Sequence, residues 1–176
     1  FVTRRWLKCP VETRREWESM KARYNPNDPS RLPPDPVATG ARLRDRNHVV
    51  TFHFSGPFWQ LREWLGFENL CLLFADDAAW LDEMVEFWTE YVAQLLEKAL
   101  KHCVPDMVHL SEDMAYKAHP MIGPESARRH LGRAYQRWGA LVRRHGVPLY
   151  GMDSDGAIGE LIPVWQEAGV NVCDPM

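Results

Sequence analysis

Two pairs of acidic residues each follow an apolar run of the kind that forms a β-strand. Glu112 and Asp113 follow the first run, and Asp153 and Asp155 follow the second. Carboxylates that end a strand act as general bases or hold a substrate by hydrogen bonds. We therefore expect Glu112, Asp113 and Asp155 to be catalytic and Asp153 to contact the substrate. Because side chains alternate across a strand end, at most one of Glu112 and Asp113 points into a cleft.

The same acidic residues also fit structural roles. Either Glu112 or Asp113 can cap a loop or the next helix, while the other pairs with a basic neighbour such as Lys117. The run from Asp153 to Gly156 is also typical of a turn. Two carboxylates at this spacing suit a hard divalent ion, but we predict substrate contact here and assign no metal site.

Histidine and aromatic side chains lie next to these strand ends and near a third one. His119 is in the loop after Asp113, and His53 lies within another predicted strand. Phe58 and Trp59 follow the Gly-Pro pair that ends this strand, and they suit a flat or apolar ligand. The alternative is that His53 belongs to the core and that the aromatic rings seal the mouth of a barrel. We expect all four residues to bind substrate.

Alternating strands and helices must position these residues. β-Branched and aromatic runs predict strands, and apolar residues spaced three and four apart predict helices. The expected strands are residues 49–54, 108–111, 147–152 and 170–173, and the expected helices are residues 14–24, 58–65, 67–74, 78–101, 124–145 and 158–168. Short links between them indicate parallel β/α units, either half of a (β/α)8 TIM barrel or a small doubly wound sheet. Both folds bind ligands at the carboxyl ends of the strands.

The first quarter of the chain has a different character. Residues 25–36 contain five prolines and predict an extended or turning loop. We therefore divide the chain into residues 1–47, an N-terminal helix and a proline-rich loop, and residues 48–176, the β/α units. Residues 49–54 should form a buried strand.

Composition excludes several classes of function. The net charge of −3 and the lack of a clustered basic face argue against nucleic acid, and no apolar run reaches the length of a membrane span. Four scattered cysteines indicate reduced thiols in a cytoplasmic protein. A glycine-rich phosphate loop, a nucleophile elbow and an HExxH motif are missing, so a nucleotide enzyme, a serine hydrolase and a zincin have no support.

A set of short motifs resembles the uroporphyrinogen decarboxylase-like superfamily. The motifs are Gly56-Pro57-Phe58-Trp59-Gln60-Leu61-Arg62-Glu63, Leu65-Gly66-Phe67-Glu68-Asn69-Leu70, Glu112-Asp113-Met114-Ala115-Tyr116-Lys117, Asp153-Ser154-Asp155-Gly156 and Glu167-Ala168-Gly169-Val170-Asn171. The resemblance runs from about Pro10 to the end of the sequence. Members are (β/α)8 barrels about twice this long, so we expect the chain to be part of such a barrel.

The resemblance implies a carboxy-lyase that acts on a tetrapyrrole or a related carboxylated small molecule, without a cofactor. Asp113, Tyr116 and Asp155 would orient the substrate. Trp64 and Asp113 stand where the decarboxylase has a Tyr and a Ser that contact the tetrapyrrole, so Trp64 joins the expected substrate contacts.

Two alternative functions remain open. One is methyl transfer of the corrinoid or coenzyme M type, although the run from Asp153 to Asp155 stands where those enzymes have a His-x-Cys zinc pair. The other is an inactive half-barrel that assembles with a second copy. We expect a homo-oligomer.

Overall fold

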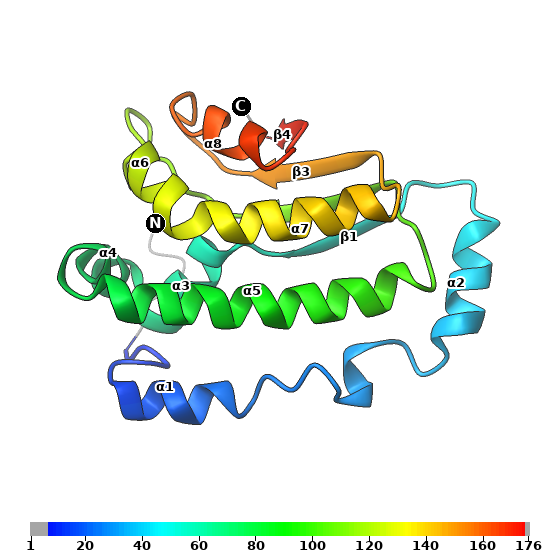
Figure 1. Ribbon diagram of the computed structural model, residues 1–176, viewed down its shortest axis with the longest axis horizontal. Helices are drawn as coiled ribbons and strands as arrows, with labels where there is room; N and C mark the ends of the chain where they lie inside the picture. Colours follow the sequence, from blue (N-terminus) through cyan, green and yellow to red (C-terminus); the bar gives the residue numbers. More distant parts are fainter. Residues whose placement is uncertain (1–6, 175–176) are drawn as a thin grey trace.

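The computed structural model describes residues 7–174, and four parallel strands form its only sheet (Figure 1). The strands follow one another across the sheet in the order β1 (Thr51–Ser55), β2 (Met107–Ser111), β3 (Leu149–Asp153) and β4 (Val172–Asp174). Their positions confirm the predicted alternation of strands and helices. The chain is an α/β fold with a parallel sheet.

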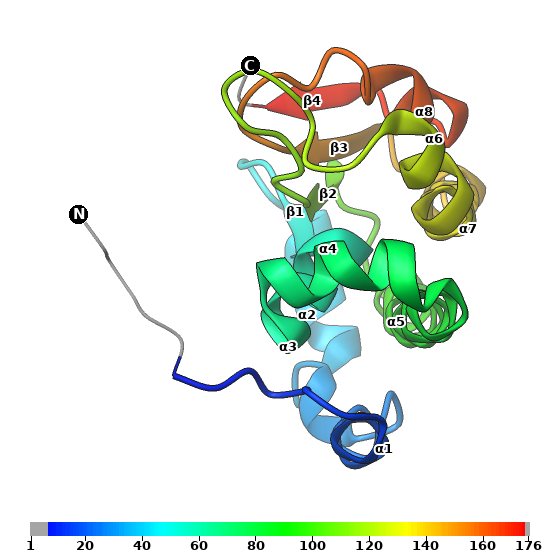
Figure 2. The ribbon, with the colours of Figure 1, turned by 90° about the vertical axis from the view of Figure 1, so that its left-hand side faces the viewer.

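The helices that connect consecutive strands all lie on the same face of the sheet (Figure 2). They are α5 (Ala78–Leu100), α7 (Gly132–Arg144) and α8 (Ile162–Glu167). A doubly wound sheet carries helices on both faces. In the described residues the second face carries no helix, so the sheet is singly wound.

Three further helices follow the carboxyl ends of β1 and β2. Two of them, α3 (Pro57–Leu65) and α4 (Phe67–Asp76), lie beside the first half of α5 (Figure 1). Helix α6 (Pro124–Ser126) continues through a π-helical turn, Ala127–Leu131, into α7. This continuous run confirms the helix expected over residues 124–145.

The core lies between the sheet and the crossover helices. In β1 to β3 the even-numbered residues point to the helices, and Val108, Leu110 and Met152 among them are fully buried. The indole of Trp138 on α7 meets the ring of Phe54 edge-on at 5.3 Å. Alternation leaves the odd-numbered residues of β1 to β3, and Val172 and Asp174 of β4, on the opposite face. The strands therefore separate an apolar layer from a face that carries the polar side chains.

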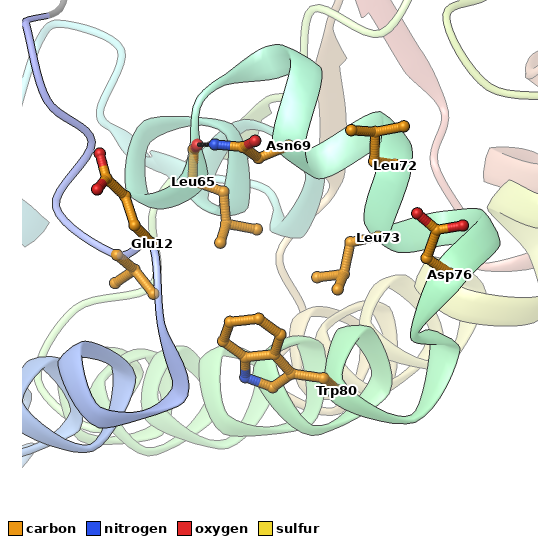
Figure 3. Close-up of a pocket in the computed structure, with 8 residues that line it drawn as sticks. Glu12, Leu65, Asn69, Leu72, Leu73, Asp76 and Trp80 are labelled. Atoms are coloured by element: carbon orange, nitrogen blue, oxygen red, sulfur yellow. Dashed lines mark hydrogen bonds between the residues drawn. The ribbon is translucent and has the colours of Figure 1, made fainter.

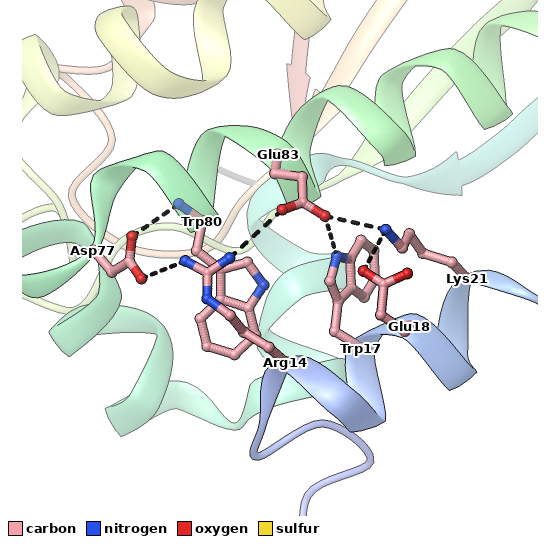
Figure 4. Close-up of polar contacts among 7 residues, drawn as sticks. All are labelled: Arg14, Trp17, Glu18, Lys21, Asp77, Trp80 and Glu83. Atoms are coloured by element: carbon pink, nitrogen blue, oxygen red, sulfur yellow. Dashed lines mark hydrogen bonds and ion pairs between the residues drawn. The ribbon is translucent and has the colours of Figure 1, made fainter.

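The N-terminal helix α1 (Arg14–Lys21) packs against α5 and shares this core (Figure 4). The buried indole of Trp17 donates a hydrogen bond to Glu83 over 2.7 Å. The guanidinium group of Arg14 pairs with Asp77 at 2.7 Å, at the first turn of α5. These contacts tie α1 to α5, and the Trp17 ring also lies 5.2 Å from the ring of Trp64 on α3.

The structure corrects three details of the sequence analysis. The first strand begins at Thr51 and is not buried, because Thr51 and His53 lie exposed on the open face of the sheet. A helix that was not predicted, α2 (Pro36–Arg44), follows a short 3-10 turn, Pro29–Arg31. The last helix begins at Ile162 rather than at residue 158, with a proline in its first turn.

Two expectations from the composition can be checked in the residues that the structure describes. Within residues 7–174, no helix is long and apolar enough to cross a membrane. The four cysteines are all unpaired.

Candidate functional site

A chain of hydrogen bonds crosses the open face of the sheet at the carboxyl ends of three strands. His53 Nε2 lies 2.8 Å from Ser111 Oγ, and Ser111 Oγ donates to Asp153 Oδ2 over 3.0 Å. With its proton directed at Asp153, Ser111 accepts a hydrogen bond from the His53 ring. A nucleophilic serine instead gives its proton to a histidine, so this arrangement positions polar groups rather than activating Ser111.

A second polar pair lies beside this chain. His109 Nε2 is 2.7 Å from Asp174 Oδ1, and the rings of His53 and His109 are 5.3 Å apart. The register places His53 next to His109, and Asp153 next to Asp174. The open face therefore has histidines on β1 and β2 and carboxylates on β3 and β4.

A fixed cation lies at the rim of this face. The guanidinium group of Arg62 on α3 pairs with Asp113 at 3.1 Å and lies 4.1 Å from the ring centroid of Trp59. The backbone amides of Glu112 and Asp113 both donate to the carbonyl oxygen of Asp153, over 2.9 and 3.1 Å. These bonds hold the Arg62–Asp113 pair next to the end of β3.

Asp113 adopts a backbone conformation that few residues tolerate. Its φ is 44°, and it is the only non-glycine residue in the described chain with a positive φ. Aspartate accepts this left-handed conformation better than most residues do. Such strain gathers at functional sites, where the surroundings hold the residue in place.

Glu112, by contrast, points away from the open face and is fully buried. Its carboxylate accepts hydrogen bonds from the Tyr135 hydroxyl over 2.5 Å and from the backbone amide of Trp59 over 2.8 Å. Gly56 leaves room for it, because a Cβ at Gly56 would lie 2.2 Å from the carboxyl carbon. Glu112 thus caps the first turn of α3 and joins that helix to α7.

The environment of Glu112 favours a proton on its carboxyl group. Burial raises the pKa of Glu112 to about 7, although hydrogen bonds from Tyr135 and the α3 backbone, and the charge of Arg62, oppose this change. Burial also raises the pKa of Tyr135 well above its ordinary value. No substrate reaches either group through the packed core, so their contact is structural.

The loop after β2 and the loop after β3 contact each other at Gly156. Gly156 has a φ of 86°, and a Cβ there would lie 2.6 Å from the carbonyl oxygen of Tyr116. The same carbonyl accepts a hydrogen bond from the Ala157 amide over 2.9 Å. The side chains of Tyr116, His119 and Asp155 are exposed on these loops. The structure places them around the strand ends but not in the hydrogen-bonded chain.

Two of the expected substrate contacts lie elsewhere. Phe58 and Trp64 are buried in the hydrophobic core, and the Trp64 indole donates to the Tyr24 hydroxyl over 3.0 Å. Trp59 is the one aromatic residue of this group that remains half-exposed beside Arg62.

The sequence analysis overlooked Ser111, His109, Asp174 and Arg62 as members of a site. Two of them, His109 and Ser111, carried a readable signal. A His-x-Ser pattern ends both β1 and β2, and period-two alternation predicts that both residues of each pattern face the same way. No sequence pattern pointed to Arg62, because its contact with Asp113 depends on how α3 packs beside the strand end.

A cavity of about 380 Å³ lies away from the strand ends, between α4 and the segment before α1 (Figure 3). Apolar side chains, among them Leu65, Leu73 and Trp80, form most of its lining, with Glu12 and Asp76 on opposite sides. The Asn69 amide donates a hydrogen bond to the Leu65 carbonyl. Because the carboxylates of Glu12 and Asp76 lie on opposite sides, the polar groups of this cavity do not meet at one point.

Comparisons with known proteins give no match for this chain, whether with family models, curated proteins or solved structures. Among residues 7–174, no three histidine, cysteine, aspartate or glutamate side chains gather as metal ligands.

Proposed function

We propose that the chain is part of a (β/α)8 barrel of the uroporphyrinogen decarboxylase-like type and that its open sheet face binds a carboxylated small molecule. Support for the barrel comes from the winding: four parallel strands in sequence order with every crossover helix on one face. A barrel repeats this unit until the sheet closes.

One observation supports the substrate class above all others. Arg62 is a partly buried cation, held by Asp113 and Trp59 at the strand ends, next to the His53–Ser111–Asp153 chain. A guanidinium group has five N–H donors, and those that Asp113 leaves free suit a substrate carboxylate. The acceptors Asp113 and Asp153 suit N–H donors. A tetrapyrrole carries both kinds of group.

Decarboxylation sets clear requirements for such a site. The bond between the substrate carbon and its carboxylate breaks, carbon dioxide leaves, and the electron pair stays on the carbon until a proton arrives. In our proposal His53 or His109, as an imidazolium, delivers that proton. Asp113, Asp155 and Tyr116 orient the substrate at the rim.

Fluorescence titration with uroporphyrin, an octacarboxylate, tests the binding step. Among the eight tryptophans, Trp59 should respond most to a ligand at this site, because it is half-exposed and its ring centroid lies 4.1 Å from the Arg62 guanidinium group. We expect saturable quenching, and a loss of affinity of about tenfold or more in Arg62→Ala, since a charge-assisted hydrogen bond is worth about 1.5–3 kcal/mol.

Arg128→Ala is the matched control, because Arg128 also pairs with one acidic residue, Glu167, but on the outer helical surface. Asp113→Asn should lower the affinity less than Arg62→Ala does, since asparagine keeps an acceptor oxygen and loses only the charge that pairs with Arg62. The proposal is wrong if folded protein shows no saturable quenching, or if Arg62→Ala and Arg128→Ala bind equally well.

A further inference from the structure

The ring of His109 is held in one orientation by residues of two other strands. Its Nε2 lies 2.7 Å from Asp174 Oδ1 on β4, so the ring reaches across β3, the strand between them. The β3 residue beside His109 in the register is Gly151. A Cβ at Gly151 would lie 2.5 Å from His109 Cδ2, which is too close for any side chain. Glycine at this position therefore leaves the room that the imidazole ring fills.

The same contact shows which nitrogen of His109 faces the open side. Cδ2 is the ring atom nearest to that Cβ position, because Cγ, the next one, is 3.5 Å from it. In an imidazole ring the Nδ1–Cε1 edge lies opposite Cδ2, so this edge points away from the sheet. Among residues 7–174, no group forms a hydrogen bond with His109 Nδ1. Nδ1 is therefore the nitrogen that His109 presents to a molecule on the open face.

The carboxylate of Asp174 determines where the ring carries its protons. An ionised carboxylate only accepts hydrogen bonds, so His109 Nε2 keeps its proton and Nδ1 is the nitrogen that gains or loses one. The charge of Asp174 also stabilises an imidazolium. His53, by contrast, contacts the uncharged hydroxyl of Ser111 and is exposed, whereas only 12% of the His109 side chain is exposed. Of the two histidines, His109 has the fixed ring and the charged partner.

From this geometry we propose that His109 is the proton donor of the site, that it works through Nδ1, and that Asp174 and Gly151 are positioning residues. The identity of the acceptor, a substrate carbon, rests on the decarboxylation proposed above. After carbon dioxide leaves, the electron pair on that carbon takes the proton from Nδ1, and the N–H electron pair stays on the ring. His109 is then neutral, with its Nε2 proton still directed at Asp174, and takes a new proton from water. His53 binds the substrate without transferring a proton.

Nitrogen-15 NMR of the ligand-free chain tests the positioning, because the chemical shifts of a histidine report which nitrogen carries a proton. Neutral His109 should show a protonated Nε2 and a bare Nδ1, and a falling pH should add the second proton at Nδ1. In Asp174→Asn the carboxamide both donates and accepts, so a fraction with the proton on Nδ1 should appear. His53→Gln is the matched control and should leave the His109 tautomer unchanged. A bare Nε2 in neutral His109 of the unaltered chain would overturn the inference.

Turnover of uroporphyrinogen tests the donor role. His109→Gln should lower kcat by about 100-fold or more and leave the affinity for uroporphyrin nearly unchanged, since general acid catalysis contributes about 10²–10⁴-fold. His53→Gln should raise KM more than it lowers kcat. Gly151→Ala, which displaces the His109 ring, should also lower kcat, whereas Gly159→Ala, with nothing within 4 Å of its Cβ position, should not.

The two measurements separate this inference from the proposed function. If the unaltered chain decarboxylates uroporphyrinogen and His109→Gln does so equally well, the inference is wrong and the proposed function stands. If the unaltered chain shows no turnover, the donor role falls with the proposed function. The NMR result decides the positioning of His109 by Asp174 in either case, because it involves no substrate.

Discussion

The two faces of the sheet use polar groups in opposite ways, and β2 shows the difference within two residues. Ser111 faces the open side and shares its hydroxyl with His53 and Asp153, near water. Glu112, the next residue, is fully buried against the helices and holds Tyr135 and the first turn of α3. Polar groups on the helical side determine how the layers pack, whereas those on the open side remain available to a ligand.

This comparison gives two adjacent acidic residues, Glu112 and Asp113, different roles. Glu112 forms its hydrogen bonds with groups in the interior of the protein, Tyr135 and the first turn of α3. Asp113 has a strained backbone and a single salt bridge to Arg62 at the rim. Carboxylates beside each other in sequence are therefore no evidence for a two-carboxylate mechanism here.

The largest expected effect is the loss of the buried carboxylate. Glu112→Ala leaves the Tyr135 hydroxyl and the Trp59 amide without acceptors inside the core. We expect the free energy of unfolding to fall by about 3–5 kcal/mol, measured by urea denaturation. Glu167→Ala, which removes an exposed partner of Arg128, should change the free energy of unfolding far less, because solvent screens exposed salt bridges. Equal losses in the two variants would contradict the distinction between the faces.

The pH dependence of stability is the next effect in size. The pKa of Glu112 is raised in the folded state, so the protonated carboxyl stabilises the fold. This contribution is complete below about pH 4.5 and is lost as the pH rises to about 7, by at most about 3 kcal/mol.

The variant Glu112→Gln isolates this contribution, because it keeps the shape of the side chain and does not titrate. The unfolding free energy of the unaltered chain minus that of the variant should fall between pH 4.5 and 7 and stay level above pH 7. All other titrating groups cancel in this difference. A level difference across the whole range would mean that Glu112 is ionised in the core.

The sequence predicted the layers better than the site, for a physical reason. In α5 and in the strands, apolar residues recur with the period of a helix or of a strand. A local stretch of sequence is therefore enough to predict which side chains are buried. Helix α2 was missed because Gly40 is its only buried residue, although Asp35 caps it and Pro36 begins it. Those two residues are themselves a start signal.

The site combines residues that are distant in sequence, which limits prediction from local patterns. Asp113 and Asp153 were expected at adjacent strand ends, and the structure places their backbones in contact. Alternation also anticipated that Glu112 and Asp113 point to different sides. One alternative paired either Glu112 or Asp113 with a basic neighbour such as Lys117, whereas Asp113 pairs with Arg62 of α3. That pairing depends on tertiary packing.

The smallest expected effect completes the comparison. Ser111→Ala removes the centre of the polar chain on the open face, yet His53 and Asp153 can both turn to water. We expect the unfolding free energy to change by less than about 1 kcal/mol, because partly exposed hydrogen bonds contribute little net stability. Affinity for uroporphyrin should fall more than stability does, since Ser111 orients His53. If Ser111→Ala destabilised the fold as strongly as Glu112→Ala, the open face would serve packing rather than binding.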